Sequence, residues 1–279
     1  MKIEIVREDN VRKIFDDTEW FIISLEGIDA IDSNIYFENK ANGEGINITG
    51  ADLSARDFVL SCECSNSNLN HIRRKEVISF FNHKYSFKIY VTYMGRTLWS
   101  DAKVRILSVP SENIYNLTRF TVSFIRENPY WKSINEFGEN IAEKIGLYGF
   151  PAFITNNIGT VYDYFRFADA VDITNEGDVE TFMKIIIEST GEVINPKITK
   201  DNKHVKILDT MVNGDIYELD FVELTVKKNG ESAISRIDRS SDFSAMKLNI
   251  GNNLVSYSAD EGEQLLNVNI YYNQLYLGV

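Results

Sequence analysis

The chain has 279 residues, 44% of them hydrophobic and 12% aromatic, which is enough for one large or two medium-sized cores and excludes a disordered chain. Its formal net charge of −12 disfavours the phosphate contacts that dominate nucleic-acid affinity. No apolar run approaches the ~20 residues that cross a bilayer, and the start MKIEIVREDN lacks the apolar core of a signal peptide. We therefore expect a protein that folds in the cytoplasm, without membrane insertion or specific nucleic-acid binding.

The first part of the chain is a series of strand-like runs with one helical interruption. β-prone runs occupy 19–30, 55–65, 85–95, 96–110 and 117–131, and 37–50 is a Gly/Asn-rich hairpin or loop. Apolar residues at spacings of three and four predict one amphipathic helix over 69–82. This pattern predicts a β-barrel or sandwich-like domain with one helix packed on it.

Two kinds of side chain in this part have more than one interpretation. Cys62 and Cys64 would share one face of a strand, where a disulfide is strained and no further Cys or His completes a metal site, so buried free thiols are favoured. Five large aromatic residues could lie in a core or an interface, and we favour the core: Trp20, Phe21, Tyr93, Trp99 and Trp131.

Charge is unevenly distributed along the chain. Residues 56–105 hold nine basic and four acidic residues, whereas the negative excess falls mainly after residue 135. The basic stretch is either an ordinary solvated surface or a positive face that docks on an acidic face of a neighbouring copy.

A boundary follows at Asn128-Pro129-Tyr130-Trp131, because a proline ends the preceding strand. After it, Ser133 and Glu136 stand at capping-box spacing before a weak helical pattern. We therefore expect a first domain over 1–132, a helical linker over 133–147 and a second domain over 148–279.

The second domain is expected to be a β-sandwich, because turn residues recur about every ten positions. The strands expected are 162–174, 179–188, 192–198, 203–209, 215–228, 231–239, 247–257 and 265–277. Asn229-Gly230 between apolar runs predicts a hairpin, and Gly251-Asn252 predicts a turn. Strict alternation at 266–272 predicts a strand with one buried face.

Little in the sequence favours catalysis. No nucleophile elbow, phosphate-binding Gly-rich loop or His-Glu-x-x-His motif is present, and His71, His83 and His204 lie apart in the sequence. A carboxylate pair could act on glycosides, but the cluster of Asp163, Asp169, Asp172 and Asp178 is explained more simply by solvated strand ends. We expect no catalytic residue, cofactor site or metal site.

Several short segments, in their order and spacing, resemble the distal tail proteins, the baseplate-hub components of long-tailed bacteriophages and siphovirus-type tails. The residues that carry the resemblance are Asn128, Pro129, Tyr130 and Trp131, then Asn175, Gly177 and Asp178, then Asn195 and Pro196, and finally Gly251 and Asn252. The resemblance implies a mainly β chain with a ring-forming first domain and a galectin-like second domain.

The resemblance also implies a structural role in the virion. It implies a ring, hexameric by analogy, at the distal end of the tail tube, with the tube protein, the tip protein and receptor-binding proteins as partners. The alternative that the sequence leaves open is a carbohydrate-binding module for host adhesion. That alternative depends on an aromatic strand that contains Tyr162, Tyr164, Phe165 and Phe167.

Overall fold

The computed structural model describes residues 1–29, 33–41, 43–53, 56–65, 70–110, 117–134, 137–140, 144–146, 165–167 and 170–279. The chain forms two compact units, each with its own hydrophobic core. The first unit comprises Met1–Ile134 together with Leu275–Val279, and the second comprises Asn135–Gln274. The last five residues of the chain therefore belong to the first unit, whereas the sequence pattern had assigned them to the second domain.

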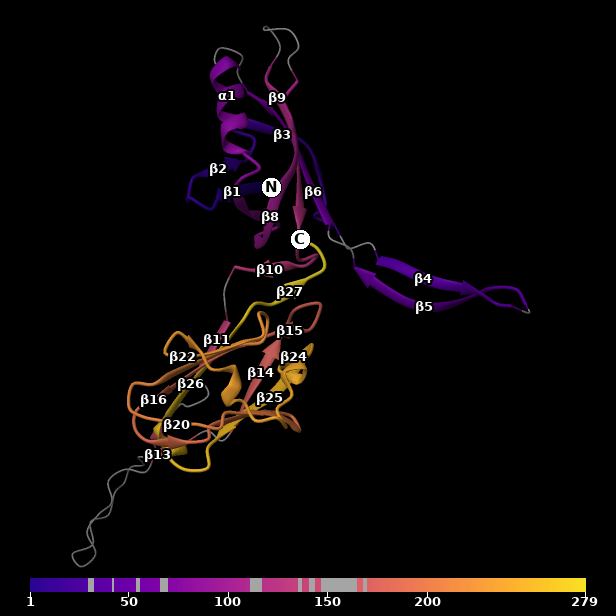
Figure 1. The fold of residues 1–279 in the computed structure, drawn as a ribbon. Helices are drawn as coiled ribbons and strands as arrows, with labels where there is room; N and C mark the ends of the chain where they lie inside the picture. The colour runs from indigo at the N-terminus through magenta and orange to yellow at the C-terminus, as the bar shows by residue number, and fades with distance from the viewer. Residues whose placement is uncertain are drawn as a thin grey trace, which may run out of the picture. The chain divides into compact units, whose positions relative to one another are not determined.

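One large antiparallel sheet forms the first unit, in the order β2-β1-β7-β8-β9-β6-β3 (Figure 1). Its strands are β1 (Lys2–Arg7), β2 (Arg12–Phe15), β3 (Trp20–Glu26), β6 (Arg56–Cys64), β7 (Ser86–Tyr93), β8 (Arg96–Ser108) and β9 (Arg119–Arg126). Two short strands, β10 (Trp131–Ser133) and β27 (Leu275–Tyr276), extend it: β10 pairs with β8 and β27 pairs with β10. The last strand, β27, therefore belongs to the sheet of the first unit.

The core of this unit lies between one face of the sheet and the helix α1 (Asn70–Phe80). Alternate residues Phe87, Ile89 and Val91 of β7 are buried, as the period of two in a strand requires. Val77 and Phe80 of α1 are buried in the same cluster. The predicted amphipathic helix is therefore confirmed, within the part of the chain that is described.

Cys62 and Cys64 are buried thiols that form no disulfide, as predicted. Burial raises the pKa of the Cys62 thiol to about 12, with a smaller contribution from Asp17. The aromatic residues divide between core and surface: Trp20 and Trp131 are buried, Trp99 is half-buried, and Phe21 and Tyr93 are exposed. The prediction that all five lie in the core is wrong for Phe21 and Tyr93. Phe21 lies on the opposite face of β3 from buried Trp20. Tyr93 shares the face of Val91 but ends β7 beside the turn, where the core no longer covers it.

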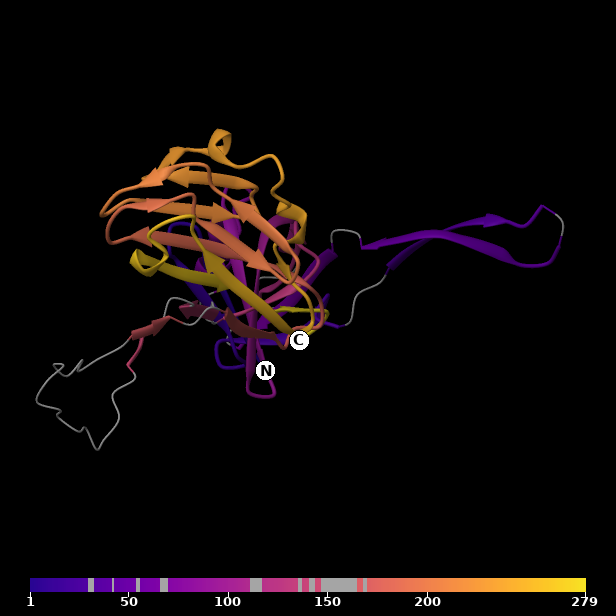
Figure 2. The ribbon, with the colours of Figure 1, turned by 90° about the horizontal axis from the view of Figure 1, so that it is seen from below.

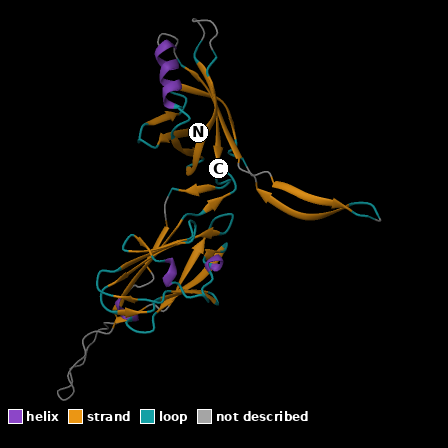
Figure 3. Ribbon diagram, in the orientation of Figure 1, coloured by secondary structure: helices purple, strands orange, loops and turns teal. Residues whose placement is uncertain are grey.

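The second unit is a sandwich of two antiparallel sheets (Figures 2 and 3). The larger has the order β11-β26-β16-β21-β22-β23, with β11 (Phe137–Asn140), β16 (Lys184–Ser189), β21 (Ile216–Asp220), β22 (Thr225–Lys228), β23 (Glu231–Ser232) and β26 (Leu266–Tyr272). The smaller has the order β14-β25-β18-β19, with β14 (Ala170–Asn175), β18 (Lys197–Lys200), β19 (Lys203–Lys206) and β25 (Gly251–Ser258).

Short pairs complete the second unit: β12 (Lys144–Gly146) with β13 (Phe165–Phe167), β15 (Thr181–Phe182) with β24 (Lys247–Leu248), and β17 (Val193–Ile194) with β20 (Thr210–Met211). The described part of this unit also contains short 3-10 helices: η2 (Ile234–Arg236), η3 (Phe243–Ala245) and η4 (Glu263–Leu265).

Strand alternation builds the second core. Val268 and Ile270 of β26 are completely buried while their neighbours are partly exposed. Residues of both sheets, such as Ile187 and Val255, join the same buried cluster. The mainly β fold class predicted from the sequence is confirmed.

The helical linker predicted over 133–147 is wrong wherever that segment is described. Ser133 belongs to β10, and β11 and β12 are strands. β11 pairs with the edge of β26, with Phe137 opposite Tyr272 and Asn140 opposite Asn269. A weak helical pattern interrupted by Gly138 cannot compete with a sheet edge that offers unpaired backbone groups.

Further predictions in the second unit need correction. Residues 215–228 are not one strand but two, β21 and β22, which pair with each other across a turn. Residues 231–239 are not one strand, because β23 ends at Ser232 and the helical turn η2 follows. Gly251 begins a strand instead of forming a turn, and it pairs with Asn175. The hairpin at Asn229-Gly230 is confirmed, with φ angles of 52° and 86° at these two residues.

Candidate functional site

A two-stranded hairpin, made of β4 (Ser33–Asn39) and β5 (Ile46–Leu53), stands outside both large sheets. We call this hairpin the arm (Figure 1). Its strands pair antiparallel, from Ser33 opposite Leu53 to Asn39 opposite Ile46, with one irregularity after Tyr36. Neither strand pairs with any other strand in the described part of the chain. The hairpin predicted as one alternative for 37–50 is thus present, and it begins earlier.

The two faces of the arm differ in chemistry. Residues directly opposite each other in the pairing share a face, so Ile35, Phe37, Ile46 and Ile48 lie on one side. These four side chains are 47% to 67% exposed. The other side carries Asn34, Glu38 and Asn47, and the Tyr36 hydroxyl donates to Oδ2 of Asp52 over 3.0 Å.

Such a hairpin is unusual on the surface of an isolated molecule. Two strands alone are marginally stable in water, because they bury too little apolar area to offset the entropy of ordering the chain. A row of exposed Ile and Phe side chains also favours association. The arm therefore has the chemistry of a surface that becomes covered by another protein.

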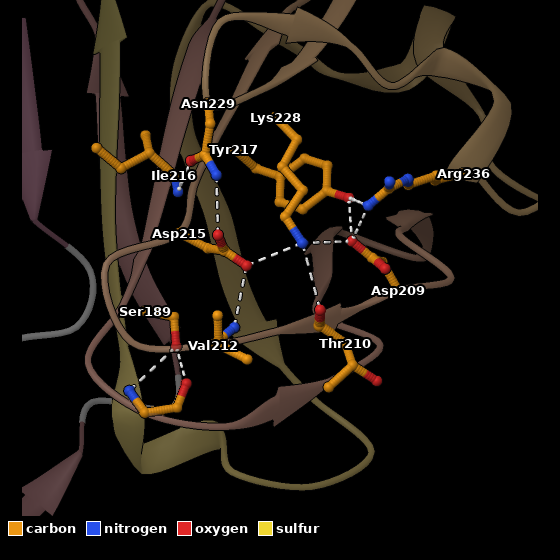
Figure 4. A network of polar contacts seen from close by, with 11 residues as sticks. Ser189, Asp209, Thr210, Val212, Asp215, Ile216, Tyr217, Lys228, Asn229 and Arg236 are labelled. Carbon is orange, nitrogen blue, oxygen red and sulfur yellow. Dashed lines mark hydrogen bonds and ion pairs between the residues drawn. The ribbon is translucent and has the colours of Figure 1, made fainter.

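A second notable feature is a polar network in the second unit (Figure 4). The Lys228 ammonium lies 2.8 Å from Oδ2 of Asp209 and 2.8 Å from Oδ2 of Asp215. Asp209 also accepts a 2.6 Å hydrogen bond from Tyr217 and an ion-paired hydrogen bond from Arg236. These residues come from the segment before β20, from the start of β21, from β22 and from η2, so the network ties four parts of the chain together.

The electrostatics of this network argue against acid–base chemistry by its two carboxylates. Desolvation would raise the pKa of Asp209, but hydrogen bonds from Lys228, Tyr217 and Arg236 outweigh it and lower that pKa to about 2. Hydrogen bonds from Lys228, the Val212 backbone and Asn229 lower the pKa of Asp215 to about 2. Both carboxylates are therefore ionised at neutral pH and neither can serve as a general acid.

The structure brings together two of the sequence segments that carried the resemblance. Asn175, at the end of β14, lies opposite Gly251, and the preceding Thr174 lies opposite Asn252. The buried Asn175 amide donates to the carbonyls of Val179 and Leu248, and its Oδ1 accepts from the Gly177 N–H. Asp178 is exposed in the turn that follows. Asn175, Gly177 and Asp178 therefore form a turn at the end of β14, and the next strand, β15, begins only at Thr181.

The other two segments have separate structural positions. Asn195 adopts a left-handed φ of 51° and donates to Asp260 over 2.8 Å, while the carbonyl of Pro196 accepts from the Ile207 N–H. In the first unit, Oδ1 of Asn128 accepts from the Tyr130 N–H across Pro129. Trp131 is completely buried, with its ring edge-on to Phe58.

Sequence reasoning missed Asn253, whose buried side chain connects several backbone segments of the second unit. Asn253 is 2% exposed, and its side chain makes four hydrogen bonds, with Ile173, Gly251 and both backbone groups of Asn249. Nothing in the sequence distinguishes it from Asn252 beside it. The arm, by contrast, had a visible signal: the alternation of Ile35 with Phe37 and of Ile46 with Ile48.

The residues considered for catalysis do not form a site in the described part of the chain. His71 and His83 are exposed, and His204 lies 3.3 Å from the Ser240 hydroxyl. Asp172 and Asp178 are exposed, whereas Asp163 and Asp169 lie outside the described residues. Across the described ranges, no group of three or more His, Cys, Asp or Glu side chains is arranged to hold a metal ion.

The aromatic strand invoked for carbohydrate binding is described only in part. Tyr162 and Tyr164 lie outside the described residues, and β13 covers only Phe165–Phe167. In the described segments, no helix is both long enough and apolar enough to traverse a bilayer.

Comparison with known families and structures agrees with this architecture. Residues 11–126 match the family described as phage tail protein RIFT-related domain, and residues 176–276 match the siphovirus-type tail component, C-terminal domain. The two matches fall one on each unit and together span more than half of the chain. No curated protein sequence is significantly similar to this chain.

Solved structures share the fold over nearly the whole length. The crystal structure of the Dit protein of phage SPP1, described as a paradigm of the hub adsorption apparatus in phages that infect Gram-positive bacteria, is 12% identical and covers 98% of each chain, with a TM-score of 0.70. The Ca-activated baseplate of phage P2 is 11% identical over 98% of each chain, with a TM-score of 0.54. The Sr-activated baseplate of phage p2 is 12% identical over 97% of each chain, with a TM-score of 0.51.

The resemblance to distal tail proteins is thereby confirmed. The first unit carries the RIFT-related domain of phage tail proteins, and the second carries the siphovirus-type C-terminal domain. The chain belongs to the siphovirus-type tail component family of bacteriophage tail proteins.

Proposed function

We propose that this protein is a structural component of a phage tail tip that assembles into a closed ring of identical copies, hexameric by analogy with the family. The ring sits at the distal end of the tail tube, joins the tube to the tip protein and anchors receptor-binding proteins. The family and the fold support a place in the tail. The protein works by fitting against other proteins and transforms no substrate.

The observation that carries the self-association is the arm. Its apolar face, Ile35, Phe37, Ile46 and Ile48, is exposed in the single chain, and burying it removes large hydrophobic side chains from water. In such an assembly the arm of each copy packs on one neighbouring copy, and each copy receives the arm of its other neighbour. This contact is head-to-tail. Head-to-tail contacts close into rings when the rotation between copies divides a full turn.

The net charge of the chain is consistent with a position around a channel. At −12, the protein has no general attraction for a nucleic acid that passes it. We therefore expect a ring that contacts DNA weakly and proteins strongly.

The test is the mass of the purified full chain in solution, followed by negative-stain images. We expect a ring with the mass of about six copies, as symmetry allows. Replacing Ile35, Phe37 and Ile48 by Ser should convert the ring to monomers while leaving both cores folded. A matched control replaces Asn34, Glu38 and Asn47, on the polar face of the arm, by Ser and should retain the ring. Strictly monomeric wild-type protein at high concentration would refute the proposal.

A further inference from the structure

Among the residues that the structure describes, seven other than glycine have positive φ angles, and they fall into two groups. Five are Asn or Asp, the residues that tolerate this conformation best: Asn10, Asp17, Asn195, Asp201 and Asn229. The remaining two are Met94, with φ 48°, and Leu224, with φ 53°. Met94 is also the most exposed large apolar side chain that is described, at 88%.

The stability of the turn does not explain why residue 94 is a methionine. It precedes Gly95, with φ 83°, in the two-residue turn between β7 and β8, a turn for which Asn-Gly is the preferred sequence. The strands beside the turn are already held by the Tyr93–Arg96 pair and by a 2.8 Å hydrogen bond between the Thr92 and Thr97 hydroxyls. An apolar side chain in a disfavoured conformation and in water points to a contact outside the folded chain.

The surroundings of this turn are apolar and basic. Tyr93 beside it is 41% exposed. Arg96 is exposed, with its guanidinium carbon 3.6 Å from the centre of the Tyr276 ring. Lys88 is exposed on the same hairpin, and no Asp or Glu occurs between residues 86 and 97. A partner surface should therefore be apolar and acidic.

The same unit carries such a surface at one edge of its sheet. β3 is the terminal strand of the sheet, and Phe21 and Ile23 on it are 47% and 55% exposed. Residues 16–29 contain five exposed acidic residues and no basic residue: Asp16, Asp17, Glu19, Glu26 and Asp29. Glu19 is ion-paired with Arg73 over 3.3 Å, which leaves the negative charge of the strand in excess.

We propose that the β7–β8 turn of one copy docks on the β3 edge of the next copy, with Met94 packed against Phe21 and Ile23. Three strands, β8, β9 and β6, separate β7 from β3 in the sheet, so the two surfaces are different parts of one unit. The contact is therefore head-to-tail, the type that can close a ring. The inference rests on the proposed ring and names a second contact within it, independent of the arm.

The test uses Met94→Asn in the full chain, with Leu224→Asn as the matched control. Asn suits a left-handed turn better than Met or Leu, so both variants should melt at the same temperature as wild type or about 2–4 °C higher. Only Met94→Asn should weaken ring formation, by at least about ten-fold in the concentration needed for assembly. A ring unaffected by Met94→Asn would overturn the inference and leave the proposed function standing.

Mixing two defective variants tests the direction of the contact. Ile23→Ser damages the receiving edge, and Met94→Asn damages the turn, so each should assemble poorly alone. In a mixture, the intact turn of the Ile23→Ser copy meets the intact edge of the Met94→Asn copy. Native mass spectrometry should then show mixed dimers and no closed ring. Absence of mixed dimers would overturn the inference, and a monomeric wild type would refute the ring itself.

Discussion

The phenol of Tyr217 donates a 2.6 Å hydrogen bond to Oδ2 of Asp209, and the same oxygen lies 2.8 Å from the Lys228 ammonium. Lys228 pairs equally closely with Asp215. Lys228, Asp209 and Asp215 are at most 20% exposed, so each charge depends on its partners to offset the loss of water.

Replacing Lys228 by Met should destabilise the second unit strongly. The variant keeps most of the length of the side chain but removes the cation that pairs with Asp215, and it leaves Asp209 paired with Arg236 alone. We expect a loss of about 2–4 kcal/mol in the free energy of unfolding, somewhat below the range for fully buried pairs. Urea unfolding of the full chain, followed through the second unit, measures it.

Lys227→Met is the matched control for that substitution. Lys227 precedes Lys228 on β22, is exposed, and should change the free energy of unfolding by less than about 0.5 kcal/mol. Equal effects of the two substitutions would show that the network does not stabilise the fold.

The low pKa values of Asp209 and Asp215 predict acid sensitivity of the second unit. Both folded pKa values are about 2, below the ~3.9 of an unfolded Asp, so the unfolded chain binds more protons as the pH falls. The stabilisation is complete above about pH 5 and is lost as the pH falls towards 2, on the order of 2 kcal/mol per carboxylate. Because both share Lys228, the two contributions should not add fully.

Urea unfolding at several pH values measures this loss. In Asp209→Asn, the decrease in stability between pH 5 and pH 2.5 should be smaller than in wild type. Asp172→Asn, at an exposed position of β14, should retain the wild-type decrease. A decrease that is the same in wild type and Asp209→Asn would contradict the assignment.

Asn253→Ala should be among the most destabilising polar substitutions in the second unit. It removes four hydrogen bonds, one of them buried, to the Ile173 carbonyl, and three of them partly buried, to the backbone of Asn249 and Gly251. We expect a loss of about 2–4 kcal/mol, since each unsatisfied buried group costs about 1–3 kcal/mol. Thermal unfolding compares it with Asn252→Ala, which removes one exposed hydrogen bond from Thr174 and should cost below about 1 kcal/mol. The reverse order would be incompatible with the structure.

Deleting Leu275–Val279 should destabilise the first unit and spare the second. The deletion removes β27, which pairs with one edge of β10, together with the buried Tyr276 and the hydrogen bond from the Val279 N–H to the Ile28 carbonyl. Hydrogen exchange should accelerate in β10 and β8 and remain slow in β26. Faster exchange in β26 alone would place these residues in the second unit.

Local pattern was sufficient for much of this fold. The alternation of apolar residues in 266–272, the helical spacing at 70–80 and the Asn229-Gly230 turn each depend on neighbours within a few positions, and all three are confirmed. Such features are encoded where they occur, because side-chain direction and turn geometry follow directly from the local backbone.

Partners distant in the sequence were decided only by tertiary structure. The segment after Ile134 carried a weak helical pattern, yet it became strand β11 because β26 offered an unpaired edge more than a hundred residues later. In the same way, residues 252 and 253 are both asparagines, and only the fold buries the side chain of Asn253 and exposes that of Asn252. Propensity differences between residues are smaller than the free energy of pairing and burial, so distant contacts prevail.

The sequence by itself determined the mainly β class, the two-part organisation and the resemblance to phage tail proteins, since all three follow from composition and the order of local motifs. The tertiary structure alone decided the return of β27 to the first unit, the Lys228 network and the exposure of the arm and of Met94. Burial and exposure are properties of a surface, and a surface exists only once segments far apart in the chain have packed together.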